Sequence, residues 1–205
     1  MFSFFTSLKS FGNVDNDILW HFKLGENILQ NGITNLDLFS WQEGLHWISQ
    51  EWLYDIYIYL VSNYLGNIGF IISMTLVSFI VGYLYFKENK NYQNFLILMI
   101  FYCFNLFFYK NGFNRPSLYS IIFISLMISN VFNKNNKKKL LKFLLYSIII
   151  ANIHGGCLIT CLLILGIVFL FDFILFLLNK NDKKNLLYDF LSIIITFIGG
   201  LINPY

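Results

Sequence analysis

This chain of 205 residues is 57% hydrophobic and only 12% charged, which excludes an ordinary soluble protein, in which about a quarter of the residues carry a charge. Its formal net charge of +3 is too small for a nucleic-acid binder, so we exclude nucleic acid as a partner. The composition predicts an integral membrane protein that is surrounded by membrane lipid.

The polar residues are concentrated in an N-terminal head, residues 1–65. Before residue 66 lie seven of the eleven acidic residues, two of the three histidines and all four tryptophans. The start of the chain, 1–13, has neither the basic region nor the cleavage site of a signal peptide, and it is too short to span a membrane. Helical apolar spacing after Asp17 and an apolar, aromatic segment at 51–64 predict interfacial helices in this extracytoplasmic head.

Residues 66–205 are mostly apolar and are interrupted by short lysine-rich breaks. Spanning the hydrocarbon core takes about 20 residues, and backbone groups in lipid must be satisfied within each segment, so every span is expected to be a helix. The first and fifth runs are long enough alone, whereas the second, third and fourth need flanking residues. The predicted fold is an all-α, polytopic membrane helix bundle of about six spans, at 66–86, 95–109, 117–132, 140–153, 157–178 and 186–202.

The basic residues predict the orientation of this bundle. Ten of the fourteen Lys and Arg residues fall in or beside the breaks after the first, third and fifth runs, and such residues accumulate on the cytoplasmic side. The head is therefore expected outside the cytoplasm, at the plasma membrane. The turns at 114–116, 152–156 and 199–204 then face the same side and converge with the head. Asp172 and Asp189 lie toward the cytoplasmic ends of their spans, as expected partners of nearby lysines.

Asp15 and Asp17 stand as a D-x-D pair just before the helical pattern. Such a pair supplies hard oxygen ligands for Mg²⁺ or Mn²⁺ beside a phosphate, or a general base next to a second carboxylate. The alternative is that Asp17 only caps the helix, which explains one aspartate and not two. Both residues are candidate catalytic groups and candidate metal ligands.

His21, Glu26 and Glu51 extend this candidate site. His21 follows Asp17 by four residues and shares its helix face, so an Asp–His pair would orient the imidazole for catalysis or hold a metal. The alternative is an interfacial histidine that is merely hydrogen-bonded to its neighbour. Glu26 lies on a different face of the helix from Asp17 and His21. Glu51 stands at the membrane boundary, where a carboxylate is energetically costly unless it is paired or has a functional role. Both glutamates are candidate substrate-binding residues.

Arg115 and His154 are the candidate binding residues of the predicted outer turns. Arg115 is the single arginine of the chain, and its planar guanidinium suits the oxygens of a lipid phosphate. A side chain that reaches toward outer headgroups explains it equally well. His154 lies in Asn-Ile-His-Gly-Gly, where the glycines permit close backbone approach and the imidazole is a candidate general acid or phosphate ligand. Its alternative is a histidine hydrogen-bonded within a turn.

These motifs, in this order, resemble those of bacterial multi-pass membrane proteins related to the GT-C glycosyltransferases, the superfamily that includes the protein mannosyltransferases. The resemblance covers nearly the whole chain. It rests on Asp15-x-Asp17-x-x-Trp20-His21, Gly25-Glu26, Phe39-Ser40, Trp47, Glu51-Trp52-Leu53, Arg115-Pro116, Asn152-x-His154-Gly155-Gly156 and Asn203-Pro204.

The resemblance implies a cell-envelope glycosyltransferase that moves a sugar from a polyprenyl-phosphate-linked donor to an acceptor at the outer face of the plasma membrane. Asp15 or Asp17 would be the base, in some members with a divalent metal. Arg115 and His154 would stabilise the departing lipid phosphate. The other function open to this sequence is a non-catalytic membrane subunit, or a component that binds an envelope lipid or polymer.

Two departures from the family pattern predict that the chain is a fragment. No span precedes the head to carry it across the membrane, and the C-terminal half that such enzymes usually possess is missing. We therefore expect the product of a split or truncated gene, with the missing remainder of the chain as a partner.

Overall fold

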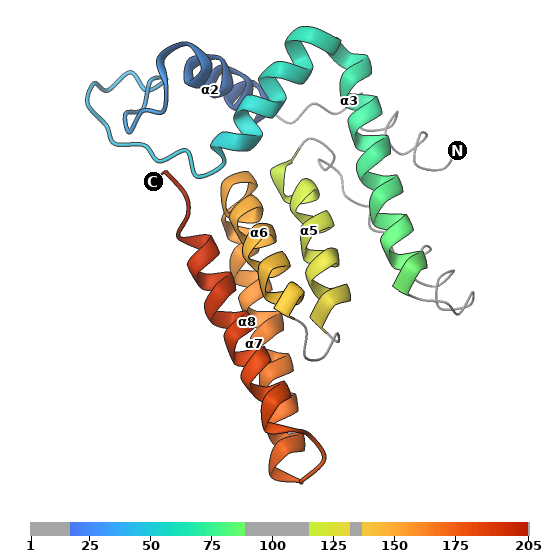
Figure 1. Cartoon of the computed structure of the whole chain (residues 1–205). Helices are drawn as coiled ribbons and strands as arrows, with labels where there is room; N and C mark the ends of the chain where they lie inside the picture. The colour runs from blue at the N-terminus through green and yellow to red at the C-terminus, as the bar shows by residue number, and fades with distance from the viewer. Residues whose placement is uncertain (1–16, 89–114, 132–136, 205) are drawn as a thin grey trace. The chain divides into compact units, whose positions relative to one another are not determined.

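The computed structural model describes residues 17–88, 115–131 and 137–204, and apart from one isolated β-bridge the regular structure in them is helical. This confirms the all-α class for these residues. The chain divides into two compact units, Met1–Tyr119 with Tyr205, and Ser120–Pro204. The helices, labelled in Figure 1, are α2 (Asp17–Asn31), α3 (Trp52–Glu88), α5 (Pro116–Val131), α6 (Lys137–Ile153), α7 (Gly156–Leu177) and α8 (Lys183–Gly200).

In the first unit, α2 packs against the first half of α3 (Figure 1). Ile18, Leu24 and Ile28 are buried on α2, at the spacing that the apolar pattern of the sequence predicts for one helix face. The helix ends at Asn31. Gly32 follows with φ 84° and donates its N–H to the carbonyl of Ile28 at 3.0 Å, as is typical of a glycine that ends a helix.

α3 is 37 residues long and changes direction within its length. Gly66 has φ 56° and ψ −151°, a backbone conformation that is open mainly to glycine. The interfacial helix predicted at 51–64 and the start of the run predicted at 66–86 are therefore one helix with a kink between them. The kink lies at the predicted border between head and bundle.

The segment between α2 and α3 folds back on α2. The N–H of Asp37 donates to the carbonyl of Leu45 at 2.8 Å, which closes the segment on itself. The Trp20 ring then lies 4.9 Å from that of Phe39 and 5.5 Å from that of Trp47, between ring centroids. Trp20 and Trp47 thus take part in an aromatic cluster within the head.

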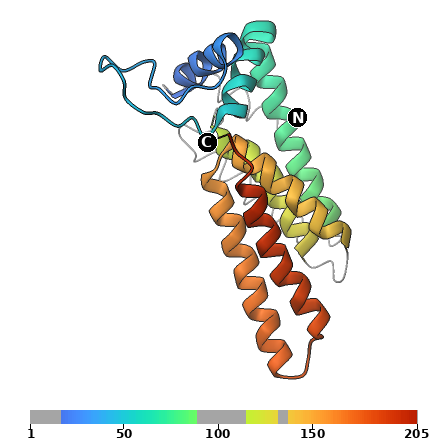
Figure 2. The same cartoon turned by 60° about the vertical axis from the view of Figure 1, so that its left-hand side comes forward.

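In the second unit, α6 and α7 both pack against α8. Figure 2 shows α7 and α8, in orange and red, running side by side and joined by a short turn. A small apolar core holds the unit together and draws on α5 as well. Its buried members are Met127, Val131, Phe143, Ile150, Cys161 and Leu165.

The amphipathic pattern of α8 is the reverse of that of a helix in a soluble protein. The side that it buries carries polar and small residues every three or four positions: Asn185, Asp189, Ser192, Thr196 and Gly199. After the two exposed lysines of its first turn, its exposed side chains are large and apolar: Leu187, Phe190, Ile194, Phe197 and Ile198. Polar and small residues between helices, with apolar ones outside, are typical of helices that face lipid.

Among the described residues, one helix is long and apolar enough to cross a membrane, and it is α7. Only 11% of its most apolar window is buried, unlike the core helix of a soluble protein. α5 and α6 have 16 and 17 residues, fewer than the about 20 that cross a bilayer. α8 carries Lys183, Lys184 and Asp189, and the predicted run 95–109 lies outside the described residues. Six spans and their orientation stay predictions.

Candidate functional site

The candidate site lies where α2 crosses α3 at a glycine. A Cβ added to Gly25 would overlap the backbone carbonyl of Asp55 and would lie 2.9 Å from Cβ of Tyr59. This close crossing places His21, one helical turn before Gly25, directly beside Asp55. The ring of Tyr54 packs edge-on against the imidazole, with the centroids 4.9 Å apart. Two packed helices therefore set the position of His21.

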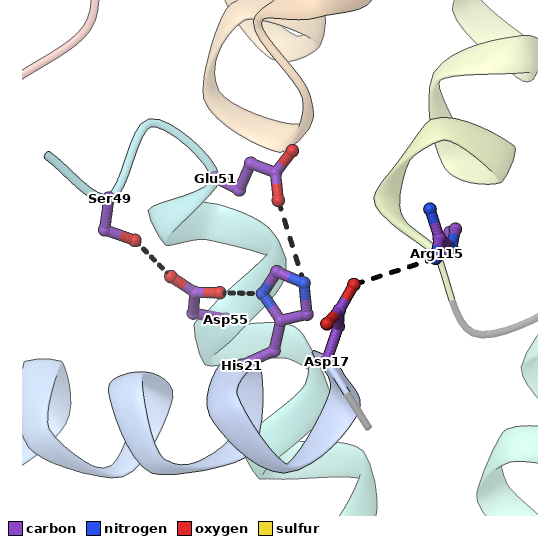
Figure 3. Close-up of polar contacts among 6 residues, drawn as sticks. All are labelled: Asp17, His21, Ser49, Glu51, Asp55 and Arg115. Atoms are coloured by element: carbon purple, nitrogen blue, oxygen red, sulfur yellow. Dashed lines mark hydrogen bonds and ion pairs between the residues drawn. The ribbon is translucent and has the colours of Figure 1, made fainter. Parts of the chain in front are cut away.

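A chain of hydrogen bonds joins Ser49, Asp55 and His21 (Figure 3). The Asp55 carboxylate is 0% exposed. Its Oδ1 lies 2.6 Å from Nδ1 of His21, and its Oδ2 accepts a hydrogen bond from Ser49 Oγ at 2.5 Å. A carboxylate only accepts hydrogen bonds, so Nδ1 carries the ring proton and Nε2 is left as the acceptor of the neutral imidazole. His21 is thereby oriented to take a proton at Nε2.

Glu51 lies on the Nε2 side of the imidazole. Its Oε2 is 3.7 Å from His21 Nε2, and its side chain is 21% exposed. Burial is the main cause of a raised pKa of the Glu51 carboxyl. Electrostatic interactions with His21, when its imidazole is protonated, and with Arg115 lower this pKa, and those with Asp55 and Asp17 raise it. Glu51 therefore keeps its proton to a higher pH than a free glutamate does, and a protonated carboxyl can donate a hydrogen bond.

Asp17 and Arg115 form the outer part of the cluster (Figure 3). An Arg115 guanidinium nitrogen lies 3.7 Å from Oδ2 of Asp17, and the two side chains are 41% and 67% exposed. An exposed pair at this distance contributes little to stability. The structure thus brings together four residues that the sequence singled out: Asp17, His21, Glu51 and Arg115.

Two other predicted residues of the head are not placed in this cluster. Asp15 lies outside the described residues. Glu26 pairs on the surface of α2 with Lys23, at 2.7 Å between Nζ and Oε2, which is an ordinary contact between residues three apart on a helix.

His154 belongs to the second unit, in the turn between α6 and α7. Gly156 leaves room for its ring, because a Cβ there would come within 3.0 Å of the imidazole Cε1. Asn152 Nδ2 donates to the carbonyl of Ile202 at 2.8 Å, and Asn203 Nδ2 donates to a carbonyl at the end of α6 at 3.0 Å. The predicted turns at 152–156 and 199–204 therefore meet.

Sequence reasoning assigned no role to Ser49 and Asp55. Asp55 interrupts an otherwise apolar, aromatic segment and follows Glu51 by one helical turn. A carboxylate in such a helix is costly unless it has a partner, and this was the signal available. Ser49 carried no signal, since an isolated serine before a helix is most simply read as a cap.

The proposed metal site depends on residues at the start of α2. Asp17 is 67% exposed and offers the hard oxygen ligand that Mg²⁺ or Mn²⁺ prefers. The second ligand of the D-x-D pair would come from Asp15. Within 17–88, 115–131 and 137–204, no group of three or more His, Cys, Asp or Glu is arranged to hold a metal ion. The metal stays a prediction.

No protein-family model matches this chain, and neither curated proteins nor solved structures gave a match. The resemblance to the GT-C glycosyltransferases therefore rests on the sequence motifs alone.

Proposed function

We propose that the chain is a membrane-embedded glycosyltransferase, or part of one, that moves a sugar from a polyprenyl-phosphate-linked donor to an acceptor hydroxyl at the outer face of the plasma membrane. The observation that carries this proposal is the Ser49–Asp55–His21 chain of hydrogen bonds. It orients an imidazole as a base, next to a glutamate with a raised pKa and near an arginine suited to phosphate.

The placement in the membrane is supported by the second unit. α7 is long and apolar enough to cross a bilayer, and α8 turns its polar side inward and its apolar side outward. The excess of lysines in alternate breaks of the sequence supports a head outside the cytoplasm.

In the proposed reaction, His21 Nε2 takes the proton of the acceptor hydroxyl, and the resulting oxygen nucleophile attacks the anomeric carbon of the sugar. The bond between that carbon and the donor phosphate breaks, and its electron pair leaves on the phosphate oxygen. Asp55 offsets the positive charge that develops on the imidazole, as buried carboxylates do for catalytic histidines. Arg115 binds the phosphate through a charge-assisted pair of hydrogen bonds.

This proposal moves the base from Asp15 or Asp17 to His21. Asp17 faces Arg115, so its carboxylate competes with the donor phosphate for the guanidinium. The buried Asp55 carboxylate holds His21 at Nδ1, so Nε2 is the ring nitrogen that would take the acceptor proton. Glu51, with its raised pKa, is placed to donate a hydrogen bond to a sugar hydroxyl.

The test is transfer by the full chain in lipid nanodiscs, with a panel of radiolabelled polyprenyl-phosphate sugars. His21→Gln should lose at least about 10²-fold in rate with little change in donor affinity, as for removal of a general base. His46→Gln is the matched control, because His46 is exposed in the same unit. Arg115→Lys should weaken donor binding instead, since an ammonium cannot reproduce the planar fork.

Transfer at the parental rate by His21→Gln, or no transfer by the parental chain with any donor, would count against catalysis. If Arg115→Lys loses lipid binding at the same time, a non-catalytic component that binds an envelope lipid becomes the better description.

A further inference from the structure

The second unit contains a cavity of about 390 Å³ at the end where α6 and α8 begin with lysines. Its volume is in the range of small-molecule sites, about 300–1,000 Å³. Three of its polar lining residues are more than nine-tenths buried: Lys139 at 3%, Asp189 at 7% and Asn185 at 8% exposure. Two of its apolar lining residues, Ile167 and Phe171, are 66% and 62% exposed. The cavity therefore combines a polar interior with an apolar rim.

The acidic groups in this cavity can accept hydrogen bonds from a ligand. Lys139 Nζ donates to the carbonyl of Val131 at 2.7 Å and to Asp189 Oδ1 at 3.1 Å, so this ammonium is already satisfied within the protein. The Lys139–Asp189 pair also confirms that Asp189 is a partner of a nearby lysine. Asp172 lines the same cavity and adds a second carboxyl that interacts with Asp189. The polar lining of the cavity therefore contains two carboxyl groups and one ammonium.

Asn185 supplies a second observation that points to a ligand. Asn181 Oδ1 accepts a hydrogen bond from the backbone N–H of Asp182 at 2.9 Å, and it also accepts one from Asn185 Nδ2 at 2.7 Å. These two bonds set the orientation of the Asn185 amide and leave its Oδ1 as an acceptor. In the part of the chain that the structure describes, this buried Oδ1 has no hydrogen-bond partner, an arrangement that is rare and costly in folded proteins.

We propose that this cavity binds the primary ammonium group of an amphipathic molecule, the headgroup of phosphatidylethanolamine. Its N–H groups would donate to Asn185 Oδ1 and to the Asp172 carboxylate. The acyl chains would lie against Ile167 and Phe171. Lys184 is exposed one helical turn before Tyr188, a residue of the cavity wall, and its ammonium would bind the lipid phosphate. A metal cation fits less well, because the Lys139 ammonium already contacts the Asp189 carboxylate. This site is independent of the proposed sugar transfer.

The experiment measures binding by isothermal titration calorimetry to the full chain in phosphatidylglycerol nanodiscs, which contain no amine. The probes are dihexanoyl-phosphatidylethanolamine, dihexanoyl-phosphatidylcholine and hexylammonium. The choline headgroup keeps the positive charge and the phosphate but has no N–H donor. The ethanolamine lipid should therefore bind at least about tenfold more tightly than the choline lipid, as for the loss of charge-assisted hydrogen bonds.

Asp172→Asn and Asn185→Leu should each remove this preference, while Asp182→Asn is the matched control, because Asp182 is exposed and makes no side-chain capping bond. Equal affinities of the parental chain for the two lipids would overturn the proposal without any variant. An unchanged preference in Asp172→Asn would also overturn it. Hexylammonium binding as tightly as the ethanolamine lipid would assign the site to free amines and exclude the lipid source.

Discussion

Replacing Gly25 by alanine tests whether the close crossing of α2 and α3 builds the His21 site. In a helix interior without neighbours this change would stabilise by about 1 kcal/mol, because alanine has the higher helix propensity. Here the new methyl group would overlap the carbonyl of Asp55, a backbone atom that cannot rotate away. Overpacking costs about 1–3 kcal/mol, and a clash with backbone belongs at the upper end. The net effect expected is a destabilisation of about 2 kcal/mol.

All four tryptophans lie before residue 66, so denaturation of the full chain in detergent, followed by tryptophan fluorescence, reports on this unit. Gln30→Ala is the matched control, since Gln30 is exposed on the same helix. The free energy of unfolding of this variant should differ from that of the parent by no more than about 0.5 kcal/mol. The Gly25→Ala variant should also alter the imidazole ¹⁵N resonances of His21, because α2 must move away from Asp55. A variant as stable as the parent, with an unchanged His21 signal, would refute the close crossing.

Two further predictions concern Glu51 and the orientation of the chain. The pKa of Glu51 is raised above its ordinary value of 4.5 by burial, so its contribution to stability is complete below that pH and is lost as the pH rises through the folded-state pKa. As the pH rises from 4.5 through the folded-state pKa of Glu51, the parent should therefore lose stability relative to Glu51→Gln, measured by tryptophan fluorescence. Free energies of unfolding that change with pH in the same way for both proteins would contradict this prediction. For the orientation, an impermeant thiol reagent applied to intact cells should label Glu43→Cys and not Lys180→Cys, in a chain without native cysteines; the reverse result would invert the topology.

Part of the site was predictable because its residue types are unusual for their surroundings. His21 and Glu51 stand out in a hydrophobic chain, and Arg115 is its single arginine. The partner of His21 was not predictable. Asp17, four residues away, was the natural candidate, yet the imidazole pairs with Asp55, 34 residues along the chain.

The helical class and several helix ends follow from local features, each of which lies within a short stretch of the sequence. Apolar spacing and the following glycine define α2, and the long apolar run defines α7. Which side of α8 faces inward, and which carboxylate meets His21, was decided only in the tertiary structure. Both depend on how closely two helices approach, at Gly199 against Ser147 and at Gly25 against Asp55. That approach is a property of surfaces formed by residues far apart in the chain, so no local pattern encodes it.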